Sequence, residues 1–346
     1  MSAPGTHPID DPRGTPARVP APGYPTDAII ALTYRCDARC EMCNIWQLKP
    51  QEFLSIDDYA GVPSSLKDIN ISGGEAFMRS DVVDIVKVIH AKCENPRIVV
   101  STNGFRTAQI VAAMEELRRT IPNIGIGVSL DGIGETHNRI RGVKHAWENA
   151  MSTLKQLRER GFTNIRIGFT AMNENIGEMR QVYDLACEMG VQFTTAVAQN
   201  SDIYFSTQVN TDVKPDTLHD ALGYVMKHEL MSYHPKRWLR AYFESGTLVF
   251  NREKKRLLEC RAGIDFFYLA PEGIVYPCLT IPSPMGDLKG TSFEDVWESE
   301  AAARVRREIA GCEQCWMICT ARSELKKNLP RALGWIAREK VKSHLS

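Results

Sequence analysis

Short apolar stretches alternate with longer segments of helical periodicity between residues 28 and 200. Most of the short stretches are rich in Ile and Val and are closed by polar residues or glycine, which is the pattern of buried strands. In the longer segments apolar residues recur every three or four positions, as in helices with one buried face. The predicted strands lie at 28–33, 68–72, 97–103, 125–130, 164–170 and 191–197, and the clearest helices at 82–92, 107–120, 146–160 and 176–189.

This alternation predicts parallel βαβ units, about six in number. If the sheet curls, six such units give a partial (β/α)6 barrel, which is the α/β core that we expect, whereas an open doubly wound sheet would fit the same pattern. In either arrangement the functional residues collect at the carboxyl ends of the strands. Candidate chemistry is therefore expected in the loops that follow the strands.

The pattern changes outside this core. Residues 1–26 are rich in proline and predict a disordered arm. Residues 215–256 predict two helices, 266–276 a hairpin that turns at Pro271-Glu272-Gly273, and 292–309 one helix capped by Ser292. The predicted divisions are the arm 1–26, the core 27–200, connecting helices 201–256, a small α+β cysteine-rich domain 257–320, and a basic amphipathic helix 321–346.

Charge and hydropathy narrow the class of protein. The 42 Lys and Arg residues balance 42 Asp and Glu residues, so we expect no nucleic-acid partner. No apolar run is long enough to span a bilayer, and the start of the chain lacks the pattern of a signal peptide. We therefore expect a cytoplasmic protein.

Eight of the ten cysteines fall into two groups. Without an export signal, grouped thiols indicate metal binding rather than disulfides. Cys93 and Cys187 lie alone inside helical patterns and are interpreted as buried, inert thiols.

The first group is Cys36, Cys40 and Cys43, in the loop after the first predicted strand. Three thiolates can ligate three irons of a [4Fe–4S] cubane and leave the fourth iron open, as a reactive site requires. A structural zinc site is the alternative, but it needs four ligands, and no fourth Cys or His lies nearby in the sequence.

The C-x3-C-x2-C motif after the first strand of a partial (β/α) barrel resembles the radical S-adenosylmethionine (SAM) superfamily. The resemblance implies that SAM chelates the open iron through its amino and carboxylate groups. An electron from the cluster, supplied by an external donor such as flavodoxin or ferredoxin, then cleaves SAM to methionine and a 5′-deoxyadenosyl radical. That radical abstracts hydrogen from the substrate.

Further segments match the family at the ends of the second, third and fourth predicted strands. The resemblance implies that residues in them contact SAM, although glycine turns and a surface arginine explain the same residues without a cofactor. Arg141 is the predicted partner of the SAM carboxylate. The predicted SAM-binding residues are Gly73, Gly74, Glu75, Ser101, Asn103, Ser129, Asp131 and Arg141.

The second group of cysteines resembles the SPASM/twitch extension, in which a hairpin and a short helix hold an auxiliary [4Fe–4S] cluster. On this resemblance its ligands are Cys260, Cys278, Cys312 and Cys315. A four-cysteine zinc site suits the same spacing. Cys319 is left over, and it is an alternative ligand, a hydrogen-atom donor to a substrate radical, or a buried thiol beside the cluster.

The basic tail, residues 321–346, carries Leu325, Leu329, Leu333, Ile336 and Leu345 roughly on one helical face. Such a stripe packs against its own protein or lies on a membrane surface, and we favour the first. Contact with a membrane would make a lipid-linked substrate plausible.

The substrate is poorly marked in the sequence. The candidates are near predicted strand ends or in the loops around them, and none stands out: Tyr204, Gln199, Asn200, Arg166 and His137. Twitch-bearing relatives favour dehydrogenation or epimerisation of a small polar molecule, a carbohydrate or a glycolipid. The alternatives are a peptide-modifying maturase and, from another class, a non-catalytic iron–sulfur electron carrier or a zinc-stabilised interaction module.

Overall fold

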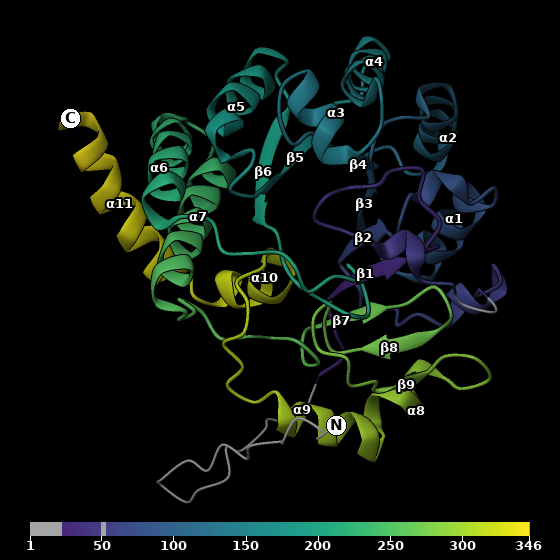
Figure 1. Ribbon diagram of the computed structural model, residues 1–346. Coiled ribbons are helices and arrows are strands. Elements are labelled where there is room, and N and C mark those ends of the chain that lie inside the picture. Colours follow the sequence, from purple (N-terminus) through teal and green to yellow (C-terminus); the bar gives the residue numbers. More distant parts are fainter. Residues whose placement is uncertain (1–22, 50–52, 346) are drawn as a thin grey trace, which may run out of the picture.

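The computed structural model describes residues 23–49 and 53–345, and within them nine strands form one sheet in the order β6-β5-β4-β3-β2-β1-β7-β8-β9 (Figure 1). Strands β1 to β6 are all parallel to their neighbours, and the sheet is not closed. The predicted partial (β/α)6 barrel is confirmed. The strands are β1 (Asp27–Ala31), β2 (Asp68–Ser72), β3 (Arg97–Thr102), β4 (Gly125–Ser129), β5 (Ile165–Ala171), β6 (Gln192–Val197), β7 (Phe266–Leu269), β8 (Ile274–Tyr276) and β9 (Gly286–Asp287).

Helices cover the outer face of the sheet, and three more pack side by side beyond β6 (Figure 1). The outer helices are α1 (Val82–Lys92), α2 (Thr107–Thr120), α3 (Glu135–Arg141), α4 (Ala146–Glu159) and α5 (Met179–Glu188), and the group of three is α6 (Pro215–Met231), α7 (Pro235–Glu253) and α11 (Leu329–Leu345). The remaining helices are α8 (Phe293–Glu298), α9 (Glu300–Glu308) and α10 (Ile318–Lys327), and short 3-10 helices occupy Ile45–Gln47, Asp57–Gly61, Ala76–Met78 and Ile176–Glu178.

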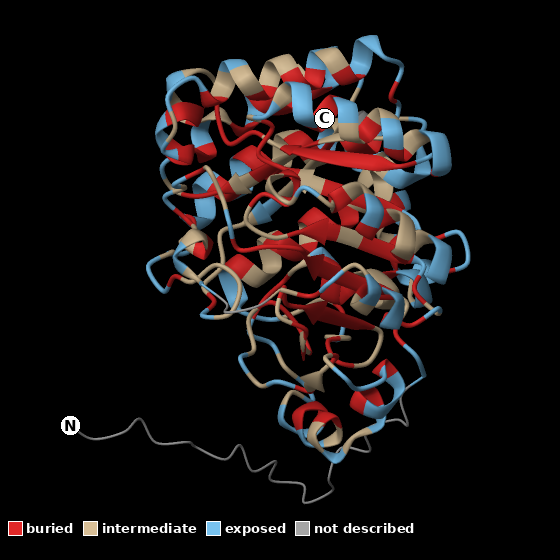
Figure 2. Ribbon diagram, turned by 90° about the vertical axis from the view of Figure 1, so that its right-hand side faces the viewer, coloured by how far each residue is buried: buried red, intermediate tan, exposed pale blue. Residues whose placement is uncertain are grey.

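Strand β5 shows how the two faces of the sheet differ. Its odd-numbered residues, from Ile165 to Ala171, are buried in the core against the helices. The intervening Arg166, Gly168 and Thr170 face the concave side and are only half-buried. Figure 2 shows the buried strands at the centre and the exposed outer surfaces of the helices around them. Solvent therefore reaches the lumen, the concave interior of the curved sheet.

The predicted hairpin at 266–276 forms as β7 and β8, but its position is unexpected. Strand β7 pairs in parallel with β1, with Ile29 opposite Tyr268. Phe267 and Leu269 belong to the same apolar core as the other face of β1. The cysteine-rich segment thus extends the main sheet across the predicted boundary at residue 257.

Three local predictions need correction. The single helix expected at 292–309 is two helices, because Ser299 ends α8 and its hydroxyl accepts from the Ala302 amide at 3.0 Å as the cap of α9. Cys187 is exposed rather than buried, with its sulfur 4.0 Å from Nη2 of Arg237 on α7, whereas Cys93 is buried as predicted. The tail is also broken, into α10 and α11.

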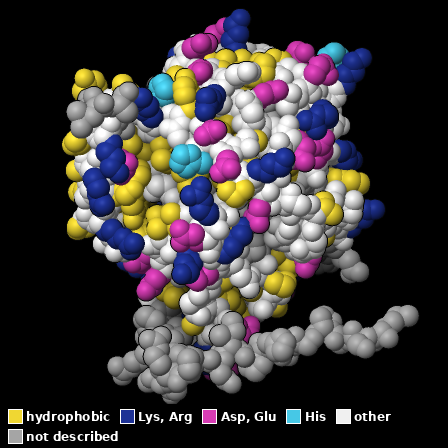
Figure 3. All heavy atoms as spheres, turned by 60° about the vertical axis from the view of Figure 1, so that its left-hand side comes forward, with side chains coloured by type: hydrophobic (Ala, Val, Ile, Leu, Met, Phe, Trp, Pro, Cys, Tyr) yellow, Lys and Arg dark blue, Asp and Glu magenta, His cyan; other side chains and the backbone are white. Residues whose placement is uncertain are grey.

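Helix α11 packs against α6 and α7 and buries Ala332 and Ile336, as the favoured interpretation of the tail predicts. Leu329 and Leu333 of the same stripe are exposed. Acidic side chains are interspersed with basic ones on the side of the molecule that Figure 3 shows. No helix in the described part of the chain combines the length and apolar character needed to cross a membrane.

Most of the predicted arm, residues 1–22, lies outside the described residues. Gly23 and Thr26 are hydrogen-bonded to the cysteine-rich segment: Trp297 Nε1 donates to the Gly23 carbonyl at 3.2 Å, and the Thr26 amide donates to the Asp265 carbonyl at 3.0 Å.

Candidate functional site

Cys36, Cys40 and Cys43 lie in the loop after β1, at the carboxyl end of the sheet. Helix α3 holds this loop, because the amides of Arg39 and Glu41 donate to the carbonyls of Arg141 and Ile140, both at 2.9 Å. All three thiols are free of disulfides. Burial raises their pKa values, to about 12 for Cys36 and about 11 for Cys43.

This donor set fits an iron–sulfur cluster. Thiolates are the ligands of such clusters, and binding to metal deprotonates thiols that burial would otherwise keep neutral. In the described residues no group of three or more His, Cys, Asp or Glu side chains is arranged to hold a single ion. A cubane is bound differently, since each thiolate ligates a different iron.

The glycine pair after β2 lies against the cysteine loop. Gly73 has φ +134°, and a Cβ on Gly74 would lie 2.3 Å from the Arg35 carbonyl oxygen. The Gly74 amide donates to the Thr33 carbonyl at 2.8 Å. Glycine is therefore needed for two backbone segments to touch. Contact of Gly73 and Gly74 with SAM stays a prediction.

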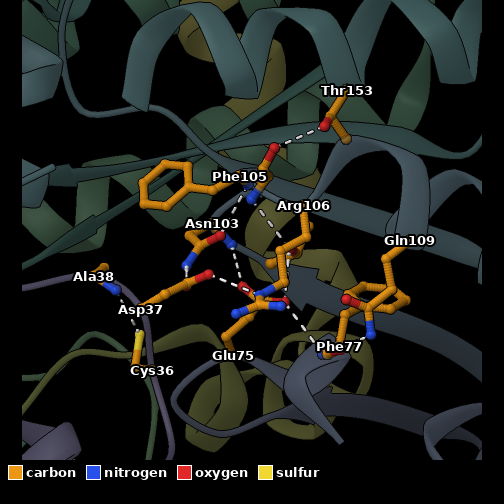
Figure 4. Close-up of polar contacts among 12 residues, drawn as sticks. Cys36, Asp37, Ala38, Glu75, Phe77, Asn103, Phe105, Arg106, Gln109 and Thr153 are labelled. Atoms are coloured by element: carbon orange, nitrogen blue, oxygen red, sulfur yellow. Dashed lines mark hydrogen bonds and ion pairs between the residues drawn. The ribbon is translucent and has the colours of Figure 1, made fainter. Parts of the chain in front are cut away.

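Glu75 and Asn103 connect this turn to β3 and to the cysteine loop (Figure 4). The buried Glu75 carboxylate accepts from the Asn103 amide at 2.8 Å, from the Thr102 hydroxyl at 2.9 Å and from the Phe77 amide at 3.2 Å. The Asn103 side chain donates to Asp37 at 2.7 Å. Burial raises the pKa of Glu75 to about 7, although these donors oppose the shift. The side chains of Glu75 and Asn103 therefore hold protein segments together, and contact of either residue with SAM stays a prediction.

Sequence reasoning missed Asp37 and Arg106. Asp37 follows Cys36 directly, and Arg106 Nε donates to its carboxylate at 2.8 Å (Figure 4). Together with Asn103 this arginine fixes the start of the cysteine loop. The position of Asp37 between the predicted ligands Cys36 and Cys40 was a signal in the sequence. The sequence does not show that Asn103 and Arg106 contact this carboxylate.

Asp131 and Arg141 form a buried ion pair, with 2.5 Å between Oδ2 and Nη2. The Thr170 amide donates to Asp131 Oδ1 at 2.7 Å, and Arg141 Nη1 lies 3.7 Å from the Cys40 sulfur. Burial opposes the charge of Arg141, but Asp131 and then Cys40 raise its pKa. Burial, and secondarily Arg141, lowers the pKa of His137 to about 3, so this histidine is neutral. Arg141 thus joins α3 to a predicted cluster ligand, and its role toward the SAM carboxylate stays a prediction.

Ser101 and Ser129 lie on the concave side of the sheet, where both are half-buried. The Ser101 hydroxyl donates to Asn70 at 2.9 Å. Nearby, Ser72 and Tyr204 share a hydroxyl–hydroxyl bond of 2.5 Å. The lumen beside the first cysteine group is therefore lined by small polar side chains and one tyrosine.

The second cysteine group comes together from three segments: the loop before β7, the loop after β8, and the stretch around the start of α10. A hydrogen bond from Cys312 lowers the pKa of Cys260, and burial raises the pKa of Cys315 to about 12. Cys278 and Cys319 share one apolar cluster. Burial, then Cys315 and Cys278, raises the pKa of Cys319.

A cavity of about 480 Å³ lies beside Cys260 and Cys312 and is also lined by Arg256, Arg261 and Arg306. Arg256 Nη1 lies 3.9 Å from the Cys315 sulfur. Converging thiols with cationic neighbours fit a negatively charged thiolate cluster. The four predicted ligands are brought together, and the fifth thiol, Cys319, lies among them.

Two family models match the regions that carry the two cysteine groups. A family model of the radical SAM superfamily matches residues 30–186, and a model described as an iron–sulfur cluster-binding domain, SPASM, matches residues 260–316. The second match contains Cys260, Cys278, Cys312 and Cys315 and ends before Cys319.

Several known proteins are similar to most of this chain. The chain is 24% identical over 285 residues to the antilisterial bacteriocin subtilosin biosynthesis protein AlbA of Bacillus subtilis, with 80% of this chain and 60% of AlbA covered. It is 27% identical to the AdoMet-dependent heme synthase of Methanosarcina barkeri (73% and 74% covered). It is 23% identical to the sporulation killing factor maturation protein SkfB of Bacillus subtilis (88% and 71% covered).

Among solved structures, anSMEcpe with bound AdoMet has the same fold, with a TM-score of 0.62, 13% identity, and 91% of this chain and 100% of that chain covered. The chain belongs to the radical SAM superfamily: it is an enzyme of the SPASM type that uses SAM and [4Fe–4S] clusters.

Proposed function

We propose that this radical SAM enzyme modifies a peptide. The observation that carries the proposal is similarity to maturation proteins along nearly the whole chain, including 88% of it for SkfB. The expectation of a small polar, carbohydrate or glycolipid substrate has no support in the comparisons, and the non-catalytic carrier is excluded by the family. The peptide-modifying alternative fits these relatives better.

In this proposal Cys36, Cys40 and Cys43 hold the cluster that binds SAM, and the bound cluster supplies the electron that cleaves SAM. Gly73 and Gly74 keep the backbone beside that loop free of side chains. Asp37, held by Asn103 and Arg106, fixes the position of the loop. These residues orient the cofactor.

The concave face of the sheet offers a place for the substrate. Ser129 and Thr170 are half-buried near the ends of β4 and β5, on the side where the cysteine loop lies. A peptide segment that enters there would bring a C–H bond near SAM while its backbone bonds to polar side chains. The four cysteines from Cys260 to Cys315 would hold the auxiliary cluster beside β1 and β7, where Cys278 packs in one apolar cluster with Ile29 and Tyr268.

The test has two stages. The protein is purified anaerobically and reconstituted, and iron and 5′-deoxyadenosine are measured for the wild type and for a Cys36/Cys40/Cys43→Ala variant. The wild type is then co-expressed with each short open reading frame that flanks its gene, and the peptides are analysed by mass spectrometry. A mass change that requires the three cysteines supports the proposal. Unchanged peptides, together with SAM cleavage that no peptide stimulates, would overturn it.

A tetrapyrrole is the second candidate substrate, because the AdoMet-dependent heme synthase is also similar to this chain, over 73% of its length. The same reconstituted enzyme is incubated with coproporphyrin III and its iron complex. Stimulated SAM cleavage with a changed porphyrin mass would favour this candidate over the peptide.

A further inference from the structure

Arg166 is a half-buried residue, and among the described residues its guanidinium has no ion-pair partner. It is the second residue of β5, so it lies near the start of that strand rather than at the predicted strand end. In the part of the chain that the structure describes, its Nε and Nη2 atoms are buried and have no hydrogen-bond partner. A buried guanidinium without partners is costly, and such a group calls for a ligand.

The surroundings of Arg166 are cationic. Burial, followed by Arg97, Arg322 and Arg240, lowers its pKa to about 9, while Asp68 acts weakly in the opposite sense. The three neighbouring arginines each have an acidic partner: Arg97 pairs with Asp68, Arg322 with Asp27 at 3.1 Å, and Arg240 with Glu229 at 3.8 Å. Asp68 is further engaged by Lys326 at 3.0 Å. The acids near Arg166 are therefore already in use.

Helix α10 covers this end of the sheet. Its residues Arg322 and Lys326 bind Asp27 and Asp68, the first residues of β1 and β2. Arg166 thus lies at the floor of the lumen, at the opposite end from the cysteine loop.

Two glycines, Gly127 of β4 and Gly168 of β5, lie next to Arg166 on the concave side of the sheet. Arg166 lies over Gly127, where an added Cβ would be 3.2 Å from its Cγ. At Gly168, the next residue on the concave side, an added Cβ would meet only the Thr194 hydroxyl, at 3.9 Å. Branched side chains usually fill the interior of such barrels. Here Gly168 leaves room on the concave side, whereas the space over Gly127 is filled by the Arg166 side chain itself.

We propose that Arg166 binds a carboxylate of the substrate at the floor of the lumen. A planar guanidinium suits this role, because it binds a carboxylate through two parallel hydrogen bonds. This proposal deepens the proposed function and rests on it where the substrate is a peptide. The carboxylate is then the C-terminus or an acidic side chain of that peptide. In the second candidate substrate it is a propionate of a tetrapyrrole. A substrate held there by one end would extend past Gly168 toward the cysteine loop.

The test measures binding to reconstituted holoenzyme with SAM, by anaerobic calorimetry. The probes are a pool of synthetic tripeptides as free acids, the same pool as C-terminal amides, and coproporphyrin III. The variants are Arg166→Gln, Arg166→Lys and the control Arg158→Gln, which changes an exposed arginine on α4. Iron content and uncoupled SAM cleavage, measured on each variant, identify any that fails to fold.

We expect free-acid peptides or coproporphyrin III to bind the wild type and the Arg158→Gln control equally. Binding should weaken roughly tenfold to a hundredfold in Arg166→Gln, the loss expected for a charged hydrogen bond, and less in Arg166→Lys. Three outcomes would overturn the inference. The probes bind Arg166→Gln as tightly as wild type, or the free acids and the amides bind equally while coproporphyrin III does not bind. The third outcome is that no probe binds at all. Arg166-dependent binding of coproporphyrin III alone would keep the inference and contradict the peptide proposal. If Arg166→Gln modifies a co-expressed peptide at the wild-type rate, the peptide proposal is kept and the inference about Arg166 is contradicted.

Discussion

Arg141 pairs with Asp131 through a 2.5 Å contact and places its other terminal nitrogen 3.7 Å from the Cys40 sulfur. The Asp131 side chain is fully buried and that of Arg141 is 11% exposed. One guanidinium therefore links the end of β4, helix α3 and the cysteine loop, and the pair can be tested by removing one charge.

Asp131→Asn should lower the free energy of unfolding by about 3–5 kcal/mol, because it leaves a buried arginine without its counterion. The control is Arg139→Gln, which removes the neighbouring pair with Glu41, whose side chains are 50% and 38% exposed. That pair should contribute less than about 1 kcal/mol. Chemical denaturation of both variants measures the difference. Equal, small losses would show that Asp131 is not the counterion on which Arg141 depends.

Gly74→Ala should prevent stable assembly of the first cluster. The new Cβ would lie 2.3 Å from a backbone oxygen of the cysteine loop, so the loop or the turn must move. Gly177→Ala is the matched control, since nothing lies within 4 Å of its added Cβ. Iron content after reconstitution should fall by about half in Gly74→Ala and stay unchanged in the control. Full iron content in Gly74→Ala would contradict the close approach.

Glu244 gives a pH-dependent prediction away from the cysteines. Burial raises its pKa to about 7 from the usual 4.5, although hydrogen bonds from Thr195 and Thr247 oppose the shift. The folded protein thus binds a proton more tightly than the unfolded chain, so the contribution of Glu244 to stability falls as pH rises from about 4.5 to 7. Its slope is at most about 1.4 kcal/mol per pH unit.

Glu244→Gln removes this titration while keeping an uncharged side chain of the same shape. Denaturant unfolding of wild type and variant across that pH range should therefore show the variant gaining relative stability with rising pH. Parallel stability curves would mean that Glu244 is ionised in the folded protein throughout.

Local periodicity predicted the helices well, and α1 and α2 begin and end at the predicted residues. Each depends on its own apolar stripe, which the sequence displays. The pairing of β7 with β1 was not predicted, because two strands more than two hundred residues apart carry no mark of their partner. In the same way the motifs drew attention to Glu75 and Asn103, whose contact with SAM stays a prediction, whereas Asp37 and Arg106 gain their role only from long-range contacts.

Cys319 can be separated from the four proposed auxiliary ligands by counting iron. It shares an apolar cluster with Cys278, and both thiols are buried, so serine at either position changes the surroundings in a similar way. A cubane without an open iron is ligated by four thiolates, and the SPASM match ends at residue 316. We therefore expect the iron content per chain to fall from about eight to about four in Cys278→Ser and to stay at about eight in Cys319→Ser. If Cys319→Ser loses the irons and Cys312→Ser keeps them, Cys319 is a ligand in place of Cys312. If Cys319→Ser keeps its irons but loses peptide modification while SAM cleavage continues, the thiol acts on the substrate, as a hydrogen-atom donor would.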